Sequence, residues 1–279
     1  MTSSPAPHPH AATPMCNAAV PLLVVMANRL PFQAANSSSN ARQLGPYAWL
    51  SPRSDASTRS SSGGIVIIAD RDGIVAVSKP EGMASIPDRR GSPGDLHSIL
   101  QEILGARLYV VHRLDRPTSG VILFARTAPV HRALCMAFQS GGASKTYHAV
   151  VLGHLEDRTI SLPLRRFGSG RVWVDEARGK PCTTVVKALE HCTGFTLAEA
   201  RPHTGRLHQI RAHLAAVGHP VAGDTVYSKE SCGAWPRLML HASRTEVQSS
   251  KGGAVFEAPL PETFSFLLDR ARTGVQGEE

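Results

Sequence analysis

Residues 112–120 read His-Arg-Leu-Asp-Arg-Pro-Thr-Ser-Gly, and residues 121–125 continue as Val-Ile-Leu-Phe-Ala. The run places one carboxylate, Asp115, between Arg113 and Arg116, directly ahead of a turn and a short apolar strand. Guanidinium groups on both sides stabilise the charged carboxylate, which suits a nucleophile or a fixed base better than a proton donor. A structural ion pair at the start of a strand would produce the same local pattern.

Five further runs place polar residues beside short apolar stretches, and they follow one another as 77–82 (VSKPEG), 145–151 (KTYHAVV), 201–214 (RPHTGRLHQIRAHL), 218–227 (GHPVAGDTVY) and 240–242 (LHA). Together with residues 112–120, these runs resemble the RluA-type pseudouridine synthases over about residues 64–268. The resemblance implies a pseudouridine synthase catalytic fold, with one mixed sheet and a central RNA-binding cleft. It also implies an isomerase that converts uridine to pseudouridine in structured RNA, either ribosomal or transfer RNA.

The resemblance assigns Asp115 as the essential catalytic carboxylate. Forming pseudouridine breaks the N1–C1′ bond, rotates the uracil and rejoins it through C5, so no atom is gained or lost overall. The chemistry therefore needs no redox group, nucleotide or metal, and we expect no cofactor. Three routes stay open at this point: Asp115 attacks C1′, adds to C6 of the ring, or removes a proton from the sugar.

Two residues on extended segments are expected to hold the target nucleotide. Arg113 lies two positions before Asp115, and the resemblance implies that it fills the space vacated by the flipped uridine. The alternative role for Arg113 is a salt bridge to Asp115, since residues at i and i+2 of an extended chain share a face. Tyr147 is expected to stack on the flipped uracil, and its alternative role is that of a core tyrosine.

Residues 206–217 are expected to form a helix that ends at Gly218. The resemblance implies that Arg206, at the start of this helix, pairs with Asp115 and keeps it charged. Gln209 and Ile210 lie three and four positions later, where they would line the same pocket.

Arg211 and His213 are expected to face phosphate or solvent, with a solvated helix face as the alternative. The complete set of substrate-binding residues predicted from the sequence is Arg113, Tyr147, Arg206, Gln209, Ile210, His112 and Arg211. Target choice is expected to depend on RNA shape and on loops such as residues 155–179.

The sequence contains four histidines close together that could suggest a metal site, but the spacing of these histidines argues against one. His203, His208, His213 and His219 are five, five and six positions apart. Helical zinc sites place histidines four positions apart with an acidic residue nearby, and no glutamate lies inside this run. We therefore expect no metal.

The composition favours an acidic partner. The chain has 279 residues and a formal net charge of +8, and only six of its 30 basic residues are lysines. Guanidinium groups bind phosphate through two hydrogen bonds and stack on bases, so RNA is the expected partner. A basic but inert surface would give the same charge. We expect a monomer with no membrane partner.

The five cysteines are odd in number and include no C-x-x-C pair, which favours a reducing compartment over a disulfide framework. The apolar stretch at residues 18–27 is too short to cross a bilayer. The expected location is the bacterial cytoplasm, or a plastid or mitochondrion if the N-terminal arm is a transit peptide.

The sequence divides into three parts. Residues 1–62 are rich in Ser, Ala and Pro, contain Asp55 as their first acidic residue, and are expected to form a disordered or presequence-like arm. Residues 63–272 are expected to form the catalytic domain, and residues 273–279 a flexible tail. The arm is equally consistent with a transit peptide, a simple tail, or translated sequence upstream of the true start.

The expected fold class is α+β with a largely antiparallel sheet, because many short strands alternate with a few helices. Strands are predicted at residues 65–69, 74–78, 121–125, 145–152, 182–189, 196–200, 238–247 and 254–256. Helices are predicted at residues 96–103, 129–138, 206–217 and 261–271. Two other functions are alternatives: a non-catalytic RNA-binding protein on the same scaffold, and a metal-dependent hydrolase built on the histidine run.

Overall fold

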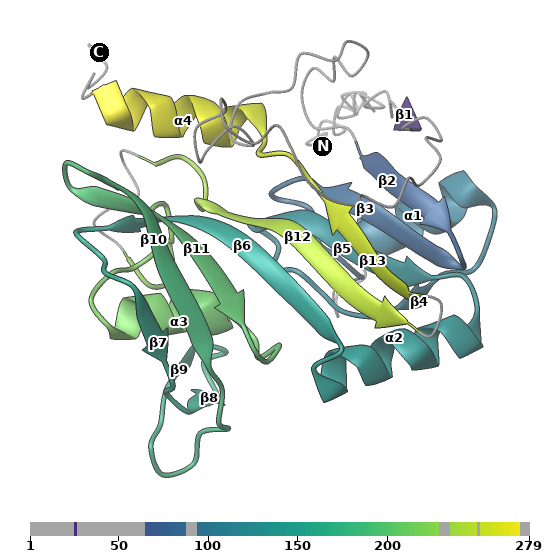
Figure 1. The fold of residues 1–279 in the computed structure, drawn as a ribbon, viewed down its shortest axis with the longest axis horizontal. Helices are drawn as coiled ribbons and strands as arrows, with labels where there is room; N and C mark the ends of the chain where they lie inside the picture. Colours follow the sequence, from purple (N-terminus) through teal and green to yellow (C-terminus); the bar gives the residue numbers. More distant parts are fainter. Residues whose placement is uncertain (1–24, 27–64, 88–93, 229–234, 250–251, 274–279) are drawn as a thin grey trace, which may run out of the picture.

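The computed structural model describes residues 25–26, 65–87, 94–228, 235–249 and 252–273 (Figure 1). The predictions for the arm over residues 1–62 and for the tail over residues 273–279 fall almost entirely outside these ranges. In the described part of the chain, no helix has the length and apolar character needed to cross a membrane.

One eleven-stranded sheet runs through the molecule in the order β1-β2-β3-β5-β12-β6-β11-β10-β7, with β4 paired to β5 and β13 to β12. Its strands are β1 (Val25–Met26), β2 (Val66–Arg71), β3 (Ile74–Lys79), β4 (Tyr109–Val110), β5 (Ser119–Ala125), β6 (Ala143–Leu152), β7 (Arg158–Ile160), β10 (Thr184–Cys192), β11 (Phe195–Pro202), β12 (Leu240–Ser249) and β13 (Gly252–Glu257). Among the strand pairs in the described residues, only β1–β2 and β5–β12 are parallel. The α+β class with a mixed, largely antiparallel sheet is therefore confirmed. A separate hairpin joins β8 (Leu164–Arg166) to β9 (Val172–Val174).

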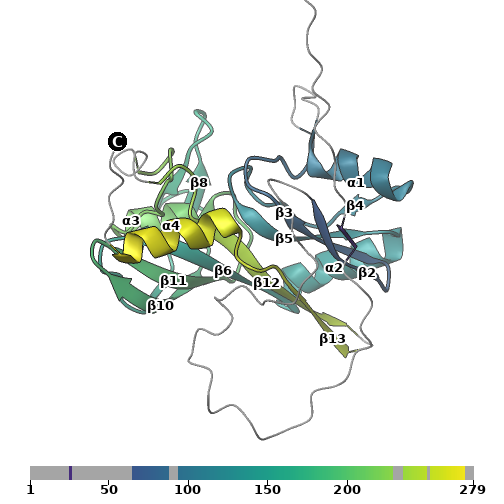
Figure 2. The ribbon, with the colours of Figure 1, turned by 90° about the horizontal axis from the view of Figure 1, so that it is seen from above.

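Strand β5 lies in the middle of the sheet, and all seven of its residues are buried. Side chains alternate between the two faces of a strand. Phe124 packs in the same cluster as Leu100 of α1 (Leu96–Leu104), whereas Leu123 packs with Leu134 of α2 (Ala128–Ser140). The two helices thus cover opposite faces of this half of the sheet (Figure 2).

The N-terminus of α1 is fixed by the side chain of Asp95. The Asp95 carboxylate accepts a hydrogen bond from the Ser98 amide at 3.0 Å, which satisfies a backbone donor that the helix leaves free. The helix ends at Gly105, whose φ of 56° closes the last turn.

Helix α3 (Gln209–Ala216) is shorter than the helix predicted over residues 206–217. His208 adopts a left-handed conformation with φ of 50°, which cannot continue a right-handed helix toward the N-terminus. The Gln209 side chain instead accepts hydrogen bonds from the Thr204 hydroxyl and the Arg206 amide, so Arg206 lies in a loop ahead of the helix. The last helix, α4 (Glu262–Thr273), packs Phe264 into the main core.

Gly120 allows the parallel contact between β5 and β12. It pairs with Ala242, and its φ of 114° lies in the region that favours glycine. A Cβ atom at this position would lie 2.1 Å from the Ala242 carbonyl oxygen. The backbones of the two strands approach too closely for any side chain.

Gly120→Ala is therefore expected to lower the free energy of unfolding by about 3 kcal/mol or more, because both backbones must shift. Gly82→Ala is the matched control, since Gly82 also has a positive φ but no atom lies within 4 Å of its Cβ position. The control is expected to cost about 1–2 kcal/mol for the backbone conformation alone. Urea denaturation of the two variants measures the difference, and equal losses would contradict the packing explanation.

Candidate active site

A cleft with a volume of about 1120 Å³ is lined by residues from segments 81–86, 110–118, 202–211 and 236–240, and by side chains of α2 and β6. All the site residues predicted from the sequence line it: Asp115, Arg113, Tyr147, Arg206, Gln209, Ile210, His112 and Arg211. The fold thus brings together predicted residues from three separate sequence runs, 112–120, 145–151 and 201–214.

The backbone around Asp115 is held on both sides. The Ser85 hydroxyl donates to the Leu114 carbonyl at 2.8 Å and accepts from the Leu114 amide at 3.1 Å. Arg116 donates from Nε to the Gly82 carbonyl at 2.8 Å, and the Asp115 carbonyl closes a turn with the Thr118 amide. The position of the carboxylate is therefore set by neighbouring backbone as well as by its own contacts.

Lys79 also holds the backbone around Met83 and around Arg116 in place. Its side chain is fully buried, and Nζ donates to the carbonyl oxygens of Pro80, Met83 and Arg116 at 2.8, 2.8 and 3.1 Å. Burial lowers the pKa of Lys79 to about 7, an effect that the charge of Asp115 opposes. Three carbonyl acceptors suit the ammonium form, which has three N–H donors.

Arg211 connects Asp115 to a second carboxylate. It donates from Nη1 to Asp115 Oδ2 at 3.1 Å, and from Nε and Nη2 to the two oxygens of Asp224 at 2.7 Å each. Arg211 is 3% exposed and Asp224 is fully buried. Burial alone would lower the pKa of Arg211, but the hydrogen bonds to Asp224 and Asp115 raise it. The guanidinium is therefore a permanent positive charge beside Asp115.

This geometry corrects two expectations. Arg211, not Arg206, pairs with Asp115, and Arg211 does not face phosphate or solvent. Arg206 is exposed on the cleft wall, and within the described residues no ion pair joins it to Asp115. The physical reason is the late start of α3: the loop before Gln209 carries Arg206 outward, and the first turn of the helix carries Arg211 inward.

Arg113 and Tyr147 both face the cleft. Arg113 is exposed, and in the described part of the chain its guanidinium forms no ion pair with Asp115. Tyr147 lies in β6 opposite Ala242 of β12 and is 7% exposed. Burial raises the pKa of the Tyr147 hydroxyl, and the charge of Asp115 adds to the effect, so the ring is neutral.

His112 and Gln209 make contacts that stabilise the walls of the cleft. His112 Nε2 accepts from the Leu123 amide at 3.1 Å, and its ring packs against Phe138. Burial lowers the pKa of His112 to about 3, with the charge of Lys145 adding to the effect, so the imidazole is neutral. The Gln209 amide is engaged on both sides, since Nε2 donates to Thr183 and Thr184. Ile210 is 6% exposed on the same wall.

His208 is a second neighbour of Asp115. The Tyr227 hydroxyl donates to the Val172 carbonyl at 2.9 Å, so it accepts from His208 Nδ1 at 3.1 Å. This leaves Nε2 of His208 facing Asp115 Oδ2 at 3.8 Å. Burial lowers the pKa of His208, and the charge of Asp115 opposes that shift. At neutral pH the imidazole is therefore uncharged, and Asp115 keeps Arg211 as its one cationic partner among the described residues.

Acidification is expected to slow turnover through His208, because the protonated ring would donate to Asp115 and reduce its reactivity. The ordinary histidine pKa is 6.5 and the shift is downward, so the rate loss is expected below pH 6.5. The charged groups that act on this ring are Asp115, Arg211, Asp224 and Arg166. Single-turnover rates between pH 5 and 8 measure the effect, and His208→Asn is expected to remove this acidic limb. An unchanged limb in the variant would assign it to another group.

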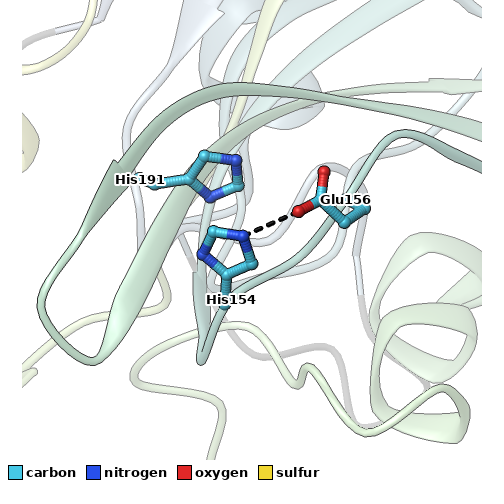
Figure 3. A group of neighbouring side chains, drawn as sticks. All are labelled: His154, Glu156 and His191. Atoms are coloured by element: carbon cyan, nitrogen blue, oxygen red, sulfur yellow. Dashed lines mark hydrogen bonds and ion pairs between the residues drawn. The ribbon is translucent and has the colours of Figure 1, made fainter.

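The histidine run does not converge on one site. His213 is fully buried, which corrects the expectation that it faces phosphate or solvent, and its ring lies 2.9 Å from both the Thr184 hydroxyl and the Leu162 carbonyl. Among the described residues, the one group whose metal-ligating atoms converge is His154, Glu156 and His191, outside the cleft (Figure 3).

Sequence reasoning missed two residues that contact the neighbours of Asp115: Asp224 binds Arg211, and Tyr227 binds His208. Asp224 and Tyr227 belong to the turn-rich stretch at 218–227, which reads as a purely structural connection. The buried Asp224 also accepts from the amides of Val226 and Tyr227, so this turn orients Arg211. The available signal was a lone acidic residue among turn formers, which does not identify its partner.

A family model described as RNA pseudouridylate synthase matches residues 73–216 of this chain. The chain is 32% identical to "Ribosomal large subunit pseudouridine synthase D" of Nitrosomonas europaea over 235 residues, which cover 78% of this chain and 68% of the relative. It is 36% identical to "tRNA pseudouridine synthase C" of Pectobacterium carotovorum over 216 residues, 67% of this chain and 56% of the relative.

The fold is also that of solved structures. Human RNA pseudouridylate synthase domain containing 4 superposes with a TM-score of 0.62 at 23% identity, covering 74% of this chain and 92% of that chain. At this level of identity the match concerns the fold alone, and it agrees with the mixed sheet described above.

Proposed function

This chain belongs to the RNA pseudouridylate synthase family and is an isomerase that forms pseudouridine in RNA; we propose that it acts on uridine in ribosomal or transfer RNA, with Asp115 as the essential carboxylate. The observation that carries the assignment of Asp115 is its place in the cleft: a carboxylate whose Oδ2 pairs with a buried Arg211. Oδ1 has no partner among the described residues and is free to face the nucleotide.

The reaction makes modest demands on the protein. The bond from C1′ to N1 breaks, a bond from C1′ to C5 forms, C5 loses its hydrogen as a proton and N1 gains a proton, so the product is an isomer of uridine and no electron or group is supplied from outside. The cleft must hold the detached uracil so that it rejoins through a different atom. Asp115 supplies the negative charge, and Arg211 keeps that charge in place. The three routes named for Asp115 remain alternatives within this proposal.

The other cleft residues bind the displaced nucleotide. Extruding a uridine from its stack costs a few kcal/mol. Arg113 is exposed at the cleft wall, where it would fill the vacated space and contact the backbone. The Tyr147 ring, which lines the cleft, would stack on the flipped base, an interaction of about 1–3 kcal/mol. Arg206, which is exposed and also lines the cleft, would contact RNA phosphate.

The hairpin of β8 and β9 supports contact with RNA beyond the target nucleotide. Arg171 lies over the rings of Trp173 and Tyr227, at 5.0 and 5.7 Å from their centroids. Tyr227 in turn contacts His208. The hairpin therefore places guanidinium and aromatic groups next to Tyr227 and His208. This position favours a role for the hairpin in selecting the target RNA.

Relatives of the chain include an enzyme named for ribosomal RNA and one named for transfer RNA, so both classes of RNA are candidate substrates. The test is to incubate the purified full chain with unmodified transcripts of large-subunit ribosomal RNA and of transfer RNAs, and to map pseudouridine by carbodiimide modification and primer extension. We expect discrete modified sites in at least one class of RNA. Absence of pseudouridine from both classes would contradict the proposed substrates.

We further propose that the protein works as a monomer in the bacterial cytoplasm, or in a plastid or mitochondrion if residues 1–62 are a transit peptide. The bacterial relatives support the first location. Sedimentation velocity of the full chain, with and without RNA, tests whether the protein is a monomer. A dimer at micromolar concentration in the absence of RNA would overturn it.

A further inference from the structure

Three exposed side chains, His154, Glu156 and His191, lie together at the ends of β6 and β10, and none of them lines the cleft (Figure 3). Their ligand atoms all lie within 4.8 Å of one another. We propose that this group binds a divalent late first-row transition-metal ion such as Zn²⁺, at a site separate from the active site. The sequence-based expectation of no metal concerned a different set of histidines.

The backbone under the site is firmly held. The Thr196 hydroxyl is fully buried, donates to the Gly153 carbonyl at 2.8 Å and accepts from the Leu155 amide at 3.0 Å. The Gly153 amide donates to the Gly194 carbonyl at 2.8 Å. These bonds join the segment after β6 to the turn between β10 and β11, so the ligands come from two connected segments.

Alternation along the chain places two ligands on one face. Leu155 is fully buried, and its neighbours His154 and Glu156 therefore point to the opposite, solvent side. His154 Nε2 and Glu156 Oε1 are 2.7 Å apart. This distance holds one proton between the two atoms, and a metal ion would replace that proton and bind both atoms.

The hydrogen bonding of His191 leaves one nitrogen ready to bind. Because the Thr196 hydroxyl already donates to Gly153, it accepts from His191 Nδ1, which lies 3.3 Å away. The proton of neutral His191 is then on Nδ1, and Nε2 carries the free lone pair. A ligand histidine that donates its other N–H to a neighbouring oxygen is the usual arrangement in metal sites.

The donor set suits the proposed ion. Two imidazoles and one carboxylate form a common set of protein ligands for Zn²⁺, with water in the remaining position. The rings of His154 and His191 stack at 3.8 Å, and the side chains of His154 and Glu156 are 64% and 70% exposed. They have room to rotate until the bonds reach about 2.0–2.2 Å. The ion would then connect the segment after β6 to β10.

The test uses the full chain, freed of metal by dialysis. Titration calorimetry with ZnCl₂ is expected to show one equivalent bound at this site, and CoCl₂ is expected to give visible bands typical of nitrogen and oxygen coordination. His191→Ala and Glu156→Gln are each expected to weaken binding by at least about tenfold. His203→Ala is the matched control, since His203 is exposed but outside the group.

Circular dichroism of the metal-free variants checks that they fold, and Zn²⁺ is expected to raise the melting temperature of the wild-type protein by more than that of His191→Ala at the same concentration. Binding that survives in both group variants, or a loss in His203→Ala alone, would place the metal elsewhere and overturn the proposal. Absence of binding at 1 mM Zn²⁺, a concentration of about 10³ times a micromolar Kd, would also overturn it.

Discussion

Replacement of Asp115 by Asn is expected to abolish pseudouridine formation and to leave RNA affinity almost unchanged. Among the described residues, two carboxylates line the cleft, and Glu81 is held by Arg237 at 2.5 Å. Asp115 is therefore the carboxylate available to the nucleotide. Asn preserves the shape of the side chain but removes its charge, and phosphate contacts, which dominate affinity for nucleic acid, are untouched.

The expected fall in single-turnover rate is on the order of 10⁴-fold or more, the size found when a group that reacts with substrate is removed. Filter binding of the same RNA measures affinity. Glu102→Gln is the matched control, because Glu102 is an exposed carboxylate outside the cleft, and it is expected to keep the wild-type rate. A variant Asp115→Asn that retained a substantial rate would show that another group reacts.

Arg211→Met is expected to lose both stability and turnover. The buried Asp224 would lose its cationic partner, and breaking a buried ion pair in this way costs about 3–5 kcal/mol of unfolding free energy. Asp115 would lose the hydrogen bond at 3.1 Å that holds its Oδ2. Arg211→Lys is expected to fail as well, because a single ammonium group cannot reproduce the planar fork that bridges two carboxylates.

The double variant Arg211→Met/Asp224→Asn separates the two effects. Asn at position 224 removes the unpaired charge yet keeps an oxygen to accept from the amides of Val226 and Tyr227. We expect urea denaturation to show recovered stability, while the rate stays low because Asp115 still lacks its partner. Recovery of the rate together with stability would mean that Arg211 acts only through the fold.

Much of the fold follows from local patterns. The Asp72-Gly73 turn between β2 and β3, the Asp95 cap of α1 and the apolar strand after Ser119 depend on neighbours in sequence, and all three are present in the structure. The parallel pairing of β5 with β12 is different, because it joins residues more than a hundred positions apart. No local pattern determines which strands become neighbours across that distance.

The residues predicted for the site all line the cleft, but their pairings, and the neighbours Asp224, Tyr227 and His208, were not predicted. Spacing put Arg206 and Arg211 on one expected helix, and a helix leaves open which of the two faces inward. The left-handed conformation of His208 makes the helix begin at Gln209. Arg206 therefore lies outside the helix, and Arg211 in its first turn pairs with Asp115. The role of Asp224 could not be predicted either, since its contact with Arg211 depends on a turn whose path the sequence does not specify.

The measurement that tests the central claim most directly is release of tritium from RNA labelled at C5 of uridine, compared between the wild-type protein and Asp115→Asn. Bond formation at C5 expels that hydrogen, so release follows the isomerisation itself. We predict release into water by the wild-type protein and none above background by the variant, at concentrations where both bind the RNA. Equal release by the two proteins would contradict the assignment of Asp115 as the carboxylate on which turnover depends.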